Sequence, residues 1–173
     1  MTVRIHEGQF FLLPVERGQH AVGLIARMPR RGGVLLGYFF GPRRTTVPSD
    51  DWLNALHPQQ AALVCRFKDS ALFRGDWKLL CNLAGFQRAQ WPVPPFHRFD
   101  SSVTHVPGGS AVTDWRVEYG DENLIVPLNE TPAEAADFKL GEDIAYDTQL
   151  LAKEVGQRVA EAAPSADDST WQR

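Results

Sequence analysis

The sequence has few cysteines, no long apolar run and no signal for export. Among its 173 residues only Cys65 and Cys81 carry thiols, and their spacing matches neither a disulfide framework nor a zinc site. No apolar run approaches the roughly 18 residues that a transmembrane helix needs. The N-terminus lacks the apolar segment and cleavage site of a signal peptide. We therefore expect a cytoplasmic protein with reduced cysteines and no membrane partner.

Catalytic and metal-binding motifs are also missing. The chain has no Gly-x-Ser-x-Gly elbow, no phosphate-binding loop and no His-Glu-x-x-His pair, and its five histidines show no metal-ligand spacing. We therefore expect no enzyme activity, no metal and no cofactor. One enzymatic alternative stays open, because nucleophile and base can meet in space rather than in sequence. It would use Cys65 with His97, or Cys81 with His105.

What the chain does contain is typical of a soluble globular protein. Hydrophobic residues make up 43% of it and charged residues 23%. At this length one domain can bury a sound core without metal or disulfide bonds, and we expect it to span residues 1–163. Residues 164–173 are small and polar, so we expect a frayed tail there.

The first half of the chain is rich in short apolar runs bounded by Gly and Pro, a pattern that predicts antiparallel strands joined by tight connections. A short helix should follow the third strand, capped by Ser49 or Asp50 and ending before Pro58. A turn is expected at 69–76. The predicted strands cover residues 8–15, 20–26, 34–40, 61–67 and 77–81.

The second half is more varied. Three prolines within residues 92–95 exclude a helix, so residues 84–99 should lie extended against the body. Pro107-Gly108-Gly109-Ser110 predicts a hairpin or loop, and strands are expected at 111–119 and 123–128 around a turn at Gly120-Asp121. Thr131-Pro132 is typical of a helix start, and apolar periodicity predicts an amphipathic helix over 142–163. The expected fold is α+β: a curved antiparallel sheet of the N-terminal strands, with a short helix after the third strand and a longer C-terminal helix.

Charge is distributed unevenly. Residues 17–98 hold 12 basic and 4 acidic residues, whereas residues 129–173 hold 4 basic and 10 acidic residues. A basic region can bind nucleic acid, and an acidic one can face a basic partner. The alternative is two solvated faces that partly neutralise each other. A nucleic-acid-binding or regulatory module using residues 17–98 is therefore a second possible function.

Several apolar and aromatic motifs follow one another in the first hundred residues. They are Gly8-Gln9-Phe10-Phe11-Leu12-Leu13-Pro14-Val15, Ala21-Val22-Gly23-Leu24-Ile25, Gly37-Tyr38-Phe39-Phe40, Phe67-Asp69-Leu72-Gly75-Trp77 and Trp91-Pro92-Pro94-Phe96. Their order resembles the immunity protein 26 family of bacterial polymorphic toxin systems. The resemblance covers about residues 5–100, and Leu13-Pro14-Val15 departs mildly from the usual Ile-Pro-Leu.

The resemblance implies a cytoplasmic antidote that binds the C-terminal toxin domain of a cognate effector, including effectors of contact-dependent inhibition, and implies no catalytic residue. Many such toxins are nucleases with cationic grooves, so an acidic antidote surface would complement them. We predict that this surface includes acidic residues of the C-terminal third. They are Glu130, Glu134, Asp137, Glu142, Asp143 and Asp147.

Overall fold

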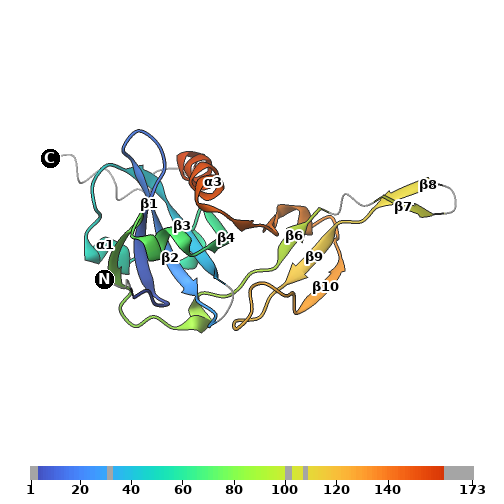
Figure 1. Ribbon diagram of the computed structural model, residues 1–173, viewed down its shortest axis with the longest axis horizontal. Helices are drawn as coiled ribbons and strands as arrows, with labels where there is room; N and C mark the ends of the chain where they lie inside the picture. Colours follow the sequence, from blue (N-terminus) through green and yellow to red (C-terminus); the bar gives the residue numbers. More distant parts are fainter. Residues whose placement is uncertain (1–3, 31–32, 100–102, 107–108, 162–173) are drawn as a thin grey trace.

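The protein has an α+β fold, as the sequence predicts. The computed structural model describes residues 4–30, 33–99, 103–106 and 109–161. It contains a six-stranded sheet, a four-stranded sheet beside it and a two-stranded hairpin that extends away from both (Figure 1). The predicted tail, residues 164–173, lies outside the described residues. No helix in the described ranges is long and apolar enough to cross a membrane.

The six-stranded sheet, which we call the main sheet, is built mostly from the first half of the chain. Its strand order is β12-β4-β3-β2-β1-β5, and every pair is antiparallel except β12 with β4. All five N-terminal strands of the sequence analysis are confirmed, and the third one runs further than expected. The bounds are β1 Gln9–Pro14, β2 His20–Arg27, β3 Val34–Arg44, β4 Leu63–Lys68, β5 Lys78–Asn82 and β12 Ala145–Tyr146.

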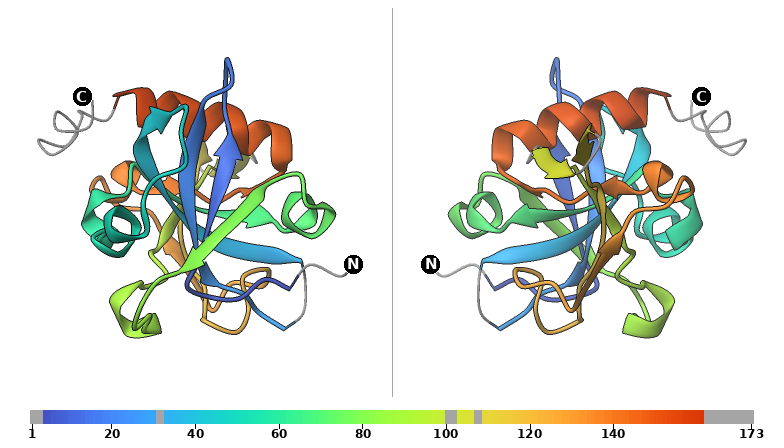
Figure 2. Two further views of the ribbon diagram at one scale, coloured as in Figure 1. Left: turned by 90° about the vertical axis from the view of Figure 1, so that its left-hand side faces the viewer. Right: turned by 90° about the vertical axis from the view of Figure 1, so that its right-hand side faces the viewer.

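Both faces of the main sheet are covered, which explains why its strands read as continuous apolar runs rather than alternating ones. Successive side chains of a strand point to opposite faces. Phe11 therefore belongs to a core cluster shared with helix α3 (Thr148–Glu161), whereas its neighbour Phe10 belongs to a second cluster. That second cluster includes Trp91 and Phe96 from the proline-rich segment. Figure 2 shows α3 lying across the strands on one side of the sheet.

One glycine of the motifs that resemble the immunity protein 26 family has a direct role in packing. Gly23 of β2 lies opposite Phe11 of β1, and a Cβ at Gly23 would meet the Phe11 ring at 2.3 Å. The Phe11 ring lies parallel to the Trp77 ring, with centroids 5.5 Å apart. Glycine at this position therefore makes room for the aromatic centre of the first core cluster.

The helices agree only in part with those that the sequence predicts. Helix α1 (Asp50–Asn54) begins at Ser49, whose hydroxyl accepts the Trp52 N–H, as expected for a cap. The predicted turn at 69–76 instead contains a short helix, α2 (Ser70–Arg74). Single 3-10 turns, η1 (Pro58–Gln60) and η2 (Arg88–Gln90), occupy the connections after α1 and β5.

The C-terminal helix is present but starts later than predicted. Residues 142–147 were expected to be helical, yet they form the end of β11 (Gly141–Glu142) and the strand β12. Each of these pairs in parallel with an earlier strand, β11 with β6 (Phe96–Arg98) and β12 with β4. Tertiary pairing therefore overrides the helical periodicity, and α3 begins only after Asp147.

The four-stranded sheet, here the small sheet, has the order β10-β9-β6-β11. Of residues 84–99, which were all expected to lie extended, residues 84–90 contain a turn and η2, whereas the prolines that follow lead into β6, a full member of this sheet. The strand predicted over 111–119 is divided between β8 (Gly109–Val112), paired with β7 (Val103–Val106), and β9 (Trp115–Glu118). The β7–β8 pairing confirms a hairpin, although Pro107 and Gly108 lie outside the described residues.

Two expectations near β10 (Asn129–Pro132) are wrong. The apolar residues 123–128 form a loop instead of a strand, and Thr131-Pro132 lies in β10 rather than at a helix start. The Leu128 N–H donates to the Glu118 carbonyl oxygen at 2.7 Å, so pairing with β9 begins only where the predicted strand ends. The only helical turn nearby is η3 (Asp137–Lys139).

Candidate functional site

The described residues offer no assembled catalytic or metal centre. No group of three or more His, Cys, Asp or Glu side chains in the described ranges is arranged to hold a metal ion. Cys65 is 1% exposed in the first core cluster, and burial raises the pKa of its thiol well above the ordinary value. Burial also raises the pKa of Cys81, assisted by a hydrogen bond with Asp50. Both shifts disfavour the thiolate that a nucleophile needs.

The histidines proposed as their bases are placed differently. The His97 Nε2 atom lies 3.2 Å from an Asp114 carboxylate oxygen, and its ring meets Phe138 edge-on with centroids 5.0 Å apart. The described contacts of His97 thus lie within the small sheet and its connections, whereas Cys65 packs towards α3. The side chain of His105 lies outside the described residues. Among the described side chains, no contact joins Cys65 to His97.

Several arginines of the basic region, residues 17–98, contact other groups of the protein. Arg27, only 3% exposed, pairs with Asp121 at 2.5 Å. Arg88 holds Glu7 at 2.6 Å and also pairs with Glu122. The Arg44 guanidinium lies over the Trp52 ring, 4.1 Å from its centroid. These cations are engaged with protein groups, so their number in the sequence overstates the positive charge available to a nucleic acid.

Three of the six acidic residues predicted to face a partner make hydrogen bonds or ion pairs that hold parts of the protein itself. The Asp147 carboxylate accepts the N–H groups of Gln149 and Leu150 and caps α3. Asp137, 6% exposed, accepts the Glu134 N–H and pairs with Arg116 at 3.0 Å. Hydrogen bonding to the Glu134 N–H is the main cause that lowers the pKa of Asp137.

The third, Asp143, joins the two sheets. Its side chain is 3% exposed and pairs with Arg66 of β4, which is 7% exposed. The Tyr119 hydroxyl donates to Asp143 at 2.8 Å, and burial together with this hydrogen bond raises the pKa of Tyr119 to about 12. Arg66 also donates to the Leu124 carbonyl oxygen at 2.7 Å. The Asp143 carboxylate is therefore engaged by groups of the protein itself, and its contact with a partner stays a prediction.

The other three acidic residues lie around the small sheet and, like Asp147, are exposed. Glu130 lies on the edge strand β10, Glu142 on the opposite edge strand β11 and Glu134 just after β10, all in exposed positions. Glu130 pairs with Arg98 at 2.8 Å, but its side chain is still 39% exposed. Such a surface pair contributes little to stability, which leaves the carboxylate free to exchange partners.

Sequence reasoning missed the most exposed apolar segment of the described chain. In the loop of residues 125–128, Ile125, Val126 and Leu128 are 50%, 61% and 78% exposed. The apolar run is typical of a half-buried strand, and Pro127 is its one residue that argues against a strand. Whether a short apolar run is buried depends on tertiary packing, which local sequence does not report.

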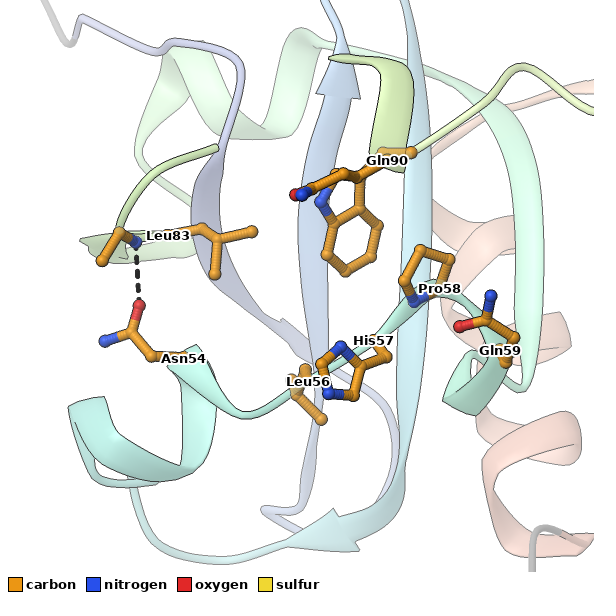
Figure 3. Close-up of a pocket in the computed structure, with 9 residues that line it drawn as sticks. Asn54, Leu56, His57, Pro58, Gln59, Leu83 and Gln90 are labelled. Atoms are coloured by element: carbon orange, nitrogen blue, oxygen red, sulfur yellow. Dashed lines mark hydrogen bonds between the residues drawn. The ribbon is translucent and has the colours of Figure 1, made fainter. Parts of the chain in front are cut away.

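A separate cavity of about 420 Å³ lies between α1, η1 and the segment after β5 (Figure 3). The Asn54 amide oxygen accepts the Ala84 N–H at 2.8 Å and holds two of its walls together. Trp91 also lines the cavity and meets Tyr38 edge-on, with ring centroids 5.1 Å apart. His57 is the single titratable side chain in the lining, so the cavity lacks the acid–base pair that general acid–base chemistry requires.

The model of one protein family, immunity protein 26, matches residues 6–105. This chain belongs to the immunity protein 26 family. The match includes strands β1–β6, α1 and α2, and thus confirms the resemblance seen in the motifs. No match was found among curated proteins or among solved structures.

The family match and the candidate surface occupy different parts of this immunity protein 26 member. The matched residues build five of the six strands of the main sheet, all except β12, and only β6 of the small sheet. The loop of residues 125–128 and the accessible acidic residues Glu130, Glu134 and Glu142 all follow residue 105. The candidate site is therefore a surface carried by the segment beyond the match.

Proposed function

We propose that this immunity protein binds the C-terminal toxin domain of a cognate bacterial polymorphic toxin and neutralises it by occlusion in the cytoplasm. Family membership carries the proposal. Blocking a toxin by occlusion requires affinity and shape rather than acid–base residues. Electrostatic steering would accelerate the encounter with a cationic toxin, such as a nuclease.

The accessible carboxylates support a role for the acidic surface. We propose that Glu130, Glu134 and Glu142 contribute to the toxin-facing surface, whereas Asp137, Asp143 and Asp147 hold its framework. Replacing the first three together by Lys should slow association with the toxin domain and weaken its salt dependence, because steering by surface charges is screened by salt. Association kinetics that do not change would rule out this surface.

The decisive experiment is co-expression with the cognate toxin domain. We expect cells producing that domain to arrest and cells producing both proteins to grow, with the two proteins eluting as one complex. Arrest that continues despite soluble immunity protein would refute the proposal. Sub-micromolar binding to mixed RNA or DNA with a steep salt dependence would instead favour the nucleic-acid module.

A further inference from the structure

The loop of residues 125–128 exposes three large apolar side chains within four positions. Leu128 is 78% exposed, Val126 61% and Ile125 50%, whereas the preceding Leu124 is 1% exposed in the second core cluster. Scattered single apolar residues on a surface are ordinary, but contiguous ones often mark binding sites. This loop is the described segment in which they are most concentrated.

The loop is held in place rather than loosely exposed. The Asn123 side-chain oxygen accepts the N–H groups of Ile125 and Val126 at 2.9 and 3.0 Å. At the other end the Leu128 N–H donates to the Glu118 carbonyl oxygen. Leu124 anchors the start of the loop in the core, where its carbonyl oxygen accepts from Arg66. A preorganised loop loses little conformational entropy on binding, which favours affinity.

Acidic side chains frame the loop. Residues 117–138 contain six acidic residues and no lysine or arginine. Directly before the loop, Asp121 is 51% exposed while its partner Arg27 is 3% exposed, and Glu122 is 68% exposed while Arg88 is 40% exposed. In both pairs the carboxylate is the more exposed of the two groups. A partner complementary to this frame would carry lysines or arginines around an apolar pocket.

We propose that the loop of residues 125–128 is the docking element for the toxin domain, and that it inserts its apolar side chains into an apolar pocket rimmed by basic residues on that domain. This inference rests on the proposed function. Leu128 and Val126 would serve as the anchors, since a few well-buried residues supply most of the binding energy of an interface. Asp121, Glu122 and Glu130 would form the polar rim and set the rate of encounter.

The test uses the full chain and the cognate toxin domain. Val126→Lys and Leu128→Lys each place a cation where the partner is expected to be apolar and basic. We expect each substitution to raise the dissociation constant at least tenfold, on the order of the loss of one anchor residue. Val47→Lys and Phe73→Lys are matched controls, because both residues are 49% exposed and lie elsewhere, Val47 after β3 and Phe73 on α2. They should change the dissociation constant less than about twofold, and thermal unfolding should confirm that all four variants fold.

The outcomes separate the two proposals. Loop variants that bind as tightly as the unmodified chain would overturn the docking loop and leave the proposed function intact. An unmodified chain that neither binds nor protects would refute the proposed function itself. Sedimentation of the unmodified chain and of Leu128→Lys, each alone, tests for self-association. Self-association that Leu128→Lys abolishes would identify the loop as an interface between copies of this chain and overturn its assignment to the toxin.

Discussion

Asp143→Asn tests whether the two sheets are joined by a buried charge pair. The substitution keeps the shape of the side chain and one oxygen for the Tyr119 hydroxyl, but it leaves Arg66, 7% exposed, without its carboxylate. Removing one partner of a buried pair costs about 3–5 kcal/mol. Because the amide oxygen retains one hydrogen bond, we expect the lower end, about 3 kcal/mol. In a protein of this size that lowers Tm by roughly 6–12 °C.

The matched control is the neighbouring Glu142→Gln, which removes the same charge from an exposed position. It should change the free energy of unfolding by less than about 0.5 kcal/mol. Urea denaturation followed by circular dichroism would compare both variants with the unmodified chain. If Asp143→Asn costs no more than Glu142→Gln, then Arg66 and Asp143 do not form the buried link described above, and Asp143 would again be a candidate for contact with the toxin.

Three further predictions concern other parts of the structure. Asp147→Ala should lower the free energy of unfolding by about 1 kcal/mol, because it removes the cap of α3; an unchanged urea midpoint would contradict that role. In the native protein an alkylating reagent should modify Cys81 well before Cys65, which is 1% exposed, and mass spectrometry showing equal rates would refute the buried position. Burial raises the pKa of every tyrosine to about 12 in the folded protein. Because the tyrosine hydroxyls of the unfolded chain therefore lose their protons at lower pH, the free energy of unfolding should fall as the pH rises from about 10 to about 12. Ultraviolet absorbance should accordingly show no tyrosine ionisation near pH 10 in the folded protein, and an ionisation there would contradict the placement of Tyr38, Tyr119 and Tyr146.

The sequence predicts the accessible part of the candidate site only as a region rich in acidic residues. The acidic excess of the C-terminal third is a property of the sequence, and it contains Glu130, Glu134 and Glu142. The same excess also includes Asp143 and Asp147, one buried against Arg66 and one capping a helix. A carboxylate in a core ion pair and one in solvent are identical in sequence, because the difference arises from residues up to 77 positions away.

By itself the sequence determined the five N-terminal strands, the short helix after the third strand and the family. Continuous apolar runs between Gly and Pro clusters leave few alternatives, and Gly23 beneath the Phe11 ring shows how closely these motifs serve the core. Only the tertiary structure decided the small sheet, the late start of α3 and the exposure of residues 125–128. Those features depend on strands of two to four residues that pair across long stretches of chain, and local propensity is too weak to specify such pairing.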